Sequence, residues 1–206
     1  MLIRPWDAAG EEQALAHVRA HPFGQLIASG RGRDVPVVVP TQFLLAGDRT
    51  VLLHLARPNP VWAAIEENPR VLLSVAGPWV YVPGAWRAEP GTDPRAGVPT
   101  TYYSAVQLVC HAEIVADADG KLEILRAQLA DLEPGAADPA GLSRLLPGIR
   151  GLRLTVEEIR GTFKYDGHKD AGHRARVAES LAGRGGPGDE AALRHLTRAA
   201  SEDGRP

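Results

Sequence analysis

Residues 50–62, Thr-Val-Leu-Leu-His-Leu-Ala-Arg-Pro-Asn-Pro-Val-Trp, constrain the fold more than any other stretch of this chain. Val51–Leu55 is a run of apolar and β-branched residues, which is the pattern of a buried strand. Pro58 and Pro60 cannot donate backbone hydrogen bonds, and each disfavours the helical conformation in the residue before it. We therefore expect the strand to end near Ala56 and to be followed by a sharp turn.

The turn should place a histidine and an arginine at the mouth of a sheet, next to the start of a helix. We expect this short helix to run from position 60 or 61 to Glu67, with Asn59 as its N-cap. The backbone N–H groups of a helix start, together with an arginine, are suited to hold a phosphate. Arg57 and His54 are therefore candidate ligand contacts, although a solvated arginine and a structural histidine explain the same stretch.

The composition bounds the class of protein. The 206 residues fit one sizeable domain or a smaller one with an appendage, and the formal net charge of −2 gives no overall field for nucleic acid. Cys110 is the only cysteine, which rules out an intramolecular disulfide, and no histidines are spaced as in common zinc motifs. There is no signal-peptide pattern and no apolar run near the roughly 20 residues of a membrane span. We expect a soluble, cytoplasmic protein without a metal.

The order of elements indicates an antiparallel β protein with peripheral helices, because a strand meander follows the first helix. The expected strands, about six, are 23–29, 35–46, 51–56, 70–76 with its continuation through 79–82, 104–116 and 151–165. The expected helices are 8–21, 60–67, 121–132, 139–146 and two in the tail between 173 and 200. This pattern favours a small barrel closed on itself, formed by residues 1–170, with a helical tail, 171–206, packed on the barrel or on a dimer partner.

Two patterns mark faces of these elements. Trp79 and Tyr81 alternate with Val80 and Val82, so two aromatic side chains should share one face of a strand. They could equally be core residues or the wall of a ligand site. In the expected helix 121–132, leucines recur at helical spacing, and we expect them to form its packing stripe. No glycine-rich phosphate loop, serine-nucleophile motif or other set of catalytic residues is present.

Four segments stand in a recognisable order: His54–Pro60, Gly77–Pro83, Val98–Tyr102 and Gly161–Lys164. They resemble the segments HLARANP, GPHAYISP, VPTWNY and GKFKLSQN of the PaiB-type family, FMN-binding negative transcriptional regulators. The resemblance also includes the start His-Pro-Phe-Gly at residues 21–24 and covers nearly the whole chain. Each segment alone is a weak signal, but four in order are specific.

The resemblance implies a six-stranded antiparallel split β-barrel of the flavin-reductase and pyridoxamine-oxidase kind, forming a homodimer with FMN at the subunit interface. The candidate cofactor contacts are His54, Arg57, Asn59, Trp79, Tyr81, Thr100, Thr101 and Lys164. Cations and the helix start would meet the phosphate, the aromatic residues would form a wall for the ring, and the threonines would lie near the ring nitrogens.

The chain departs from the family's segments at several positions. Val39-Pro40 replaces a Thr-His pair, and Trp79 stands where the family has a histidine. Thr101-Tyr102 replaces Trp-Asn, and Tyr165–His168 replaces Ser-Gln-Asn after the shared lysine. These differences indicate a divergent member of the family.

Three functions remain open from the sequence. The first is an FMN-binding transcriptional regulator, which rests on the resemblance, because acidic and basic residues balance in the tail and no helix-turn-helix with a basic face is present. The second is a flavin-dependent oxidoreductase in which the Arg87–Gly97 loop covers the substrate. The third is haem binding with His54, His111 or His168 as the axial ligand.

Overall fold

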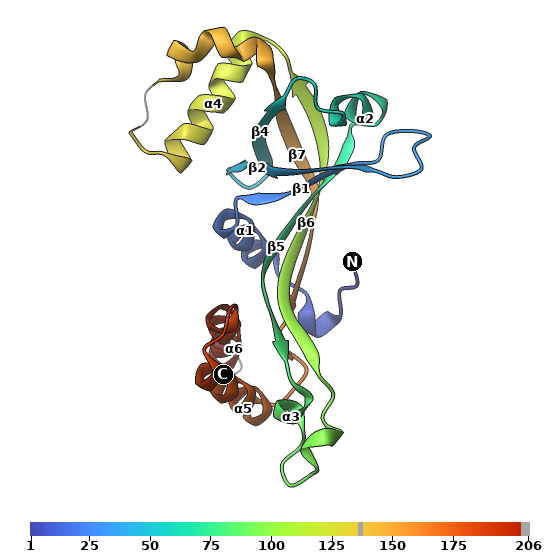
Figure 1. The fold of residues 1–206 in the computed structure, drawn as a ribbon, viewed down its shortest axis with the longest axis vertical. Coiled ribbons are helices and arrows are strands. Elements are labelled where there is room, and N and C mark those ends of the chain that lie inside the picture. Colours follow the sequence, from blue (N-terminus) through green and yellow to red (C-terminus); the bar gives the residue numbers. More distant parts are fainter. Residues whose placement is uncertain (136–137, 203–206) are drawn as a thin grey trace. The chain divides into compact units, whose positions relative to one another are not determined.

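The structure is a computed structural model that describes residues 1–135 and 138–202. Its strands form one sheet in the order β2-β1-β5-β6-β7-β4-β3, and the pairs β1–β2, β1–β5, β3–β4 and β4–β7 are antiparallel (Figure 1). The strands are β1 (Phe23–Ala28), β2 (Val37–Gln42), β3 (Leu44–Ala46), β4 (Thr50–Ala56), β5 (Arg70–Val82), β6 (Thr100–Val115) and β7 (Ile149–Lys164). The α-helices are α1 (Glu11–Ala20), α2 (Val61–Glu67), α3 (Gly84–Arg87), α4 (Ala118–Leu132), α5 (Ala171–Arg184) and α6 (Asp189–Glu202). The 3-10 helices are η1 (Pro5–Asp7), η2 (Pro94–Ala96) and η3 (Pro139–Gly148).

The described sheet has seven strands, one more than the sequence predicts, because the stretch 35–46 forms two strands instead of one. Phe43 interrupts it: its side chain is buried, and its backbone N–H donates to Pro22 O at 3.1 Å. β2 lies at an edge of the sheet, where Pro40 is tolerated because an edge strand need not donate all of its N–H groups. In contrast, Gly77-Pro78 does not end a strand, and β5 continues through it to Val82.

The chain divides into two compact units, which we describe separately. The tail unit consists of residues 1–10, 76–105 and the positions from 161 onward. The main unit consists of residues 11–75 and 106–160. The long strands β5, β6 and β7 each contribute one part to each unit. His54, Arg57 and Asn59 therefore belong to the main unit, and the other five candidate contacts belong to the tail unit.

In the main unit, α4 buries a different face from the one that its leucines predict. The buried residues of α4 are Lys121, Ile124 and Gln128, whereas the leucines are only partly buried or exposed. Ile124 packs against Leu52 and Val115 in the core. The two polar residues are buried with partners: Lys121 Nζ donates to Leu146 O at 2.8 Å, and Gln128 Oε1 lies 2.7 Å from His54 Nδ1. These hydrogen bonds compensate the burial of the two polar side chains, which therefore occupy the inner face of α4. The prediction that the leucines form the packing face of this helix is wrong.

No helix within the described ranges is both long enough and apolar enough to cross a lipid bilayer. Cys110 is a free thiol in the core, and burial, with a smaller contribution from Glu157, raises its pKa to about 12. A thiol that remains protonated and buried is a poor nucleophile. Cys110 is therefore a packing residue.

Candidate functional site

The turn between β4 and α2 forms as the sequence predicts, with one shift of position. β4 ends at Ala56 and α2 begins at Val61, so Pro60, not Asn59, occupies the N-cap position. A proline side chain cannot accept a hydrogen bond, so the capping acceptor comes from the residue before it. Asn59 Oδ1 accepts from the backbone N–H of Val61 at 3.0 Å. Trp62 Nε1 donates to Ala56 O at 3.0 Å and ties the helix back to the end of the strand.

Arg57 is an exposed cation at this turn. Its backbone N–H donates to Gly148 O at 2.8 Å, while its guanidinium makes no hydrogen bond or ion pair with any residue that the structure describes. His54 is exposed on β4, where its ring contacts Gln128, so its observed contact is structural. Of the two charged or titratable candidates at the turn, Arg57 is the one whose side chain is available to an anionic ligand.

A pocket in the tail unit contains the two aromatic candidates. Trp79 and Tyr81 are 67% and 52% exposed, on the face of β5 opposite the buried Val80 and Val82. They line a pocket of about 510 Å³ together with the turn between α5 and α6. This volume lies in the range of roughly 300–1,000 Å³ that small-molecule sites occupy. The aromatic face predicted from the alternation is thus a pocket wall, not part of the core.

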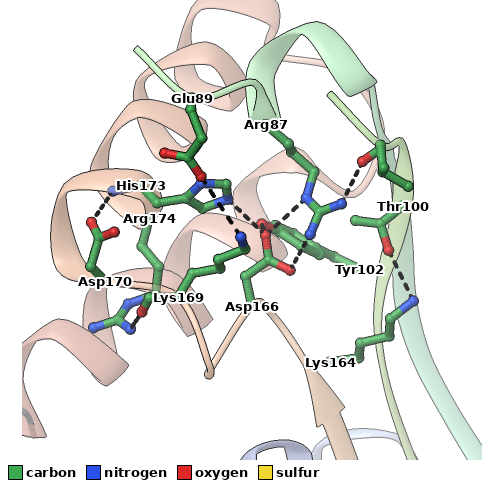
Figure 2. A network of polar contacts seen from close by, with 11 residues as sticks. Arg87, Glu89, Thr100, Tyr102, Lys164, Asp166, Lys169, Asp170, His173 and Arg174 are labelled. Carbon is green, nitrogen blue, oxygen red and sulfur yellow. Dashed lines mark hydrogen bonds and ion pairs between the residues drawn. The ribbon is translucent and has the colours of Figure 1, made fainter. Parts of the chain in front are cut away.

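Lys164 and Thr100 come together at the same end of the chain's long strands. Lys164 Nζ, at the end of β7, donates to Thr100 Oγ1 at 2.9 Å, at the start of β6 (Figure 2). The ammonium also lies 5.9 Å from the centroid of the Tyr103 ring, and it makes no ion pair within the described residues. Thr101 is half-buried and, as the next residue of the strand, points to the opposite face from Thr100. Lys164 is therefore a positioned cation, with Thr100 as its hydrogen-bond partner.

A buried carboxylate close to Lys164 organises the polar groups of the tail unit. Figure 2 shows three side chains converging on Asp166: Arg87 from α3, Tyr102 from β6 and His173 from α5. Arg87 donates from Nε at 3.0 Å and from Nη2 at 2.9 Å, the Tyr102 hydroxyl donates at 2.8 Å, and His173 Nε2 lies at 3.0 Å. The side chain of Asp166 is only 3% exposed. Its carboxylate therefore connects the turn after β7 to the neighbouring α5 and to α3 and β6, whose contact residues lie 79 and 64 residues away in the sequence.

The pKa values of this network indicate a fixed scaffold. Burial alone would raise the pKa of Asp166, but hydrogen bonds from Arg87, Tyr102 and His173 and the charge of Arg87 outweigh it and lower the pKa below its ordinary value. Burial and the neighbouring Asp166 charge raise the pKa of Tyr102. Asp166 therefore remains an acceptor and Tyr102 a donor over the working range of pH. The network is suited to hold elements in place, not to exchange protons.

Little in the sequence indicates this network, which lies where the chain departs from the PaiB-type segments that it resembles. Asp166 belongs to the segment that replaces Ser-Gln-Asn, and it adopts a left-handed conformation with φ of 55°. An Asp-Gly pair after a strand is a turn signal, because aspartate tolerates this conformation better than most residues. That signal could have located the turn, but not the partners of Asp166.

A second buried carboxylate lies in η1. Asp7 is 6% exposed, and its Oδ1 has no hydrogen-bond partner among residues 1–135 and 138–202. Burial raises the pKa of Asp7, although the positive charges of His168 and Lys164 oppose this effect. A raised pKa means that folding penalises the ionised form. The penalty is complete above the pKa of the folded state and disappears as the pH falls through it.

We therefore expect Asp7→Asn, which removes the charge and keeps the size, to raise the melting temperature at pH 7–8. The gain should shrink on acidification and vanish below the ordinary aspartate pKa of about 3.9. Thermal unfolding measured across this pH range checks the expectation, and Asp34→Asn, at an exposed aspartate, is the control. A gain that does not depend on pH would contradict it.

The fold and the site define a class: an antiparallel split barrel with an aromatic pocket and positioned cations. Solved structures agree on the fold. The chain is similar to the flavocytochrome Anf3 from Azotobacter vinelandii, with 22% identity, a TM-score of 0.60, and coverage of 77% of this chain and 70% of that one. It is also similar to the FAD and heme binding protein from Mycobacterium smegmatis, with 18% identity, a TM-score of 0.55, and coverage of 75% and 71%. The predicted fold class is thus confirmed.

The family is established by sequence. A family model described as "Putative FMN-binding domain" matches residues 1–158, and the chain belongs to this family. The chain is also 26% identical over 179 residues to "Protease synthase and sporulation protein PAI 2" of Bacillus subtilis (strain 168), which covers 82% of this chain and 83% of that protein. The resemblance to the PaiB-type family is confirmed.

Proposed function

We propose that this protein binds FMN as a homodimer. The observation that carries the proposal is the pocket of about 510 Å³ with two exposed aromatic side chains, in a chain whose family is that of FMN-binding domains. Trp79 and Tyr81 are suited to pack against a planar ring. The exposure of Trp79 and, in the main unit, of Phe23 at 61% supports a partner subunit, because large aromatic side chains are usually covered.

The cations of the two units fit a phosphate-bearing cofactor. Most arginines of the described chain are paired with carboxylates, but Arg57 is not, and Lys164 is held by a hydroxyl and an aromatic ring. Unpaired cations of this kind suit a dianionic phosphate, to which they can donate charge-assisted hydrogen bonds. In the main unit, Arg57 is available to an anionic group of the cofactor. In the tail unit, Trp79 and Tyr81 are available to pack against its ring, and Lys164 is available to an anionic or carbonyl group. Bound FMN would supply the capacity for electron and hydride transfer.

An absorption spectrum tests the proposal. The protein is recorded as purified, and again after mixing with excess FMN and desalting. We expect flavin bands that survive desalting. A colourless protein that retains no flavin would overturn the proposal, and a Soret band would favour the haem alternative. Two of the three candidate haem ligands already have ring contacts: His54 with Gln128, and His168 with the Trp6 ring at 5.3 Å.

For the cellular role we propose regulation, supported by the PaiB-type relative, with a flavin-dependent oxidoreductase as the second candidate. The charge distribution favours the second, because the net charge is −2 and ion pairs neutralise most described arginines, which weakens the case for direct contact with DNA. The name of the relative Anf3, a flavocytochrome, also fits redox chemistry.

Two assays separate these roles. Turnover of NAD(P)H by the FMN-loaded protein would support the oxidoreductase. Binding to DNA that depends on sequence and weakens with salt would support the regulator. The loop proposed to cover a substrate, Arg87–Gly97, is anchored at its start by the ion pair between Arg87 and Asp166.

A further inference from the structure

The pocket that contains Trp79 and Tyr81 has a second wall made by residues outside the family match. The match ends at residue 158, whereas Arg184 and the turn Gly186–Gly188 line the pocket together with β5. This turn connects α5 to α6 in the tail unit. The helical tail is therefore a structural part of the pocket.

Arg184 holds this turn in place through contacts with Asp189, Tyr81 and Trp86. Its Nε and Nη2 donate to the Asp189 carboxylate at 2.9 and 2.5 Å, and its Nη1 donates to Tyr81 O at 3.0 Å. The guanidinium also stacks 4.7 Å from the centroid of the Trp86 ring. Asp189 is almost completely buried, and its Oδ2 also accepts from the backbone N–H of Gly186 at 2.7 Å. The turn is thus held directly against β5.

Gly188 allows the turn to approach β5 this closely. Its φ of +84° is unfavourable for other residues, and a Cβ atom at this position would lie 2.5 Å from Trp79 O. The neighbouring Pro187 has a ring-restricted backbone. The second wall of the pocket is therefore pre-formed, which reduces the entropy lost when a ligand binds.

The chemistry of the pocket selects an uncharged, planar ligand group. Arg184 is the cation among the described lining residues, and Asp189 neutralises its charge. The remaining lining groups include indole, phenol and proline rings, which pack against flat apolar surfaces. A phosphate would find no free cation here, whereas the ring of a flavin would find flat apolar groups from both β5 and the turn.

We propose that the turn between α5 and α6 is the second wall of the flavin-ring site, and that Arg184 is the positioning residue that holds it. This inference rests on the proposed binding of FMN and deepens it. It requires that the tail contribute to the affinity for the ring and not to the affinity for the phosphate. Loss of Arg184 must then weaken the binding of FMN and of riboflavin, which lacks the phosphate, by the same factor.

The test measures the dissociation constants of FMN and riboflavin by quenching of flavin fluorescence, for the full-length protein and its variants. We expect Arg184→Ala and Gly188→Ala to weaken both ligands by about 3- to 10-fold, the loss expected when one side of an aromatic contact is removed. Arg184→Lys, which keeps the charge but not the forked geometry, should lie between wild type and Arg184→Ala. Arg194→Ala is the matched control, since Arg194 pairs with Glu190 on an exposed face of α6.

Unchanged affinities in Arg184→Ala, with wild type binding both flavins, would overturn the inference and leave the proposed function intact. An effect on FMN alone would also overturn it, because it would place Arg184 at the phosphate. If wild type binds neither flavin, the proposed function fails and the inference fails with it. Circular dichroism checks that each variant is folded. If Arg184→Ala does not fold, the two flavin affinities of Arg184→Lys test the inference instead.

Discussion

Replacing Asp166 with alanine is expected to lower the free energy of unfolding by about 3–5 kcal/mol, the range for removing one partner of a buried ion pair. The carboxylate accepts hydrogen bonds from Arg87, Tyr102 and His173, and the side chains of Arg87 and Asp166 are only 12% and 3% exposed. Without the carboxylate, the buried guanidinium has no counter-charge and the Tyr102 hydroxyl has no acceptor. Urea unfolding of wild type and variant measures the loss.

Glu190→Gln is the control for this experiment. Glu190 pairs with Arg194 at the surface of the same unit, where ion pairs contribute between about 0 and 1 kcal/mol. A loss in Asp166→Ala no larger than that of the control would show that the network does not stabilise the fold. The cooperativity of unfolding is also informative, because a separate early transition in Asp166→Ala would show that the substitution destabilises the tail unit alone.

The same carboxylate should make stability depend on pH. The pKa of Asp166 is lowered in the folded state, so its contribution is present above the ordinary aspartate pKa of about 3.9 and is lost as the pH falls through the folded pKa. We therefore expect the difference between wild type and Asp166→Asn to be constant near neutral pH and to shrink in acid. This trend is opposite in sign to that of Asp7, whose ionised form is penalised.

The parts of the fold that could be predicted are those determined by local chemistry. Two prolines within three residues end β4 and position α2, whatever surrounds them, and apolar alternation places Trp79 and Tyr81 on one face of β5. The boundaries of the two tail helices follow from the glycines between them. The order of the family's segments then indicates the split barrel, which no single strand pattern specifies.

The parts that could not be predicted depend on partners distant in sequence. Asp166 meets Tyr102 and Arg87 across 64 and 79 residues, and no local pattern connects them. The burial of Lys121 and Gln128 on α4 likewise requires acceptors and donors that only the folded chain supplies. For the pocket, the sequence indicates the aromatic wall but not the wall built by the α5–α6 turn.

Replacing Arg57 with alanine is expected to raise the dissociation constant of FMN by about 10- to 150-fold and to leave that of riboflavin unchanged. A hydrogen bond to a charged group contributes about 1.5–3 kcal/mol, which corresponds to this range. Arg57 is exposed, and its guanidinium is unpaired within the described chain, so its loss should disturb the ligand's phosphate and little else. Fluorescence titration with both flavins measures the effect, and Arg144→Ala, at another exposed arginine, is the control.

Equal losses of affinity for both flavins would place Arg57 at the ring, and no loss for either would remove it from the site. An FMN-selective loss in Arg57→Ala would assign the phosphate contact to the β4–α2 turn.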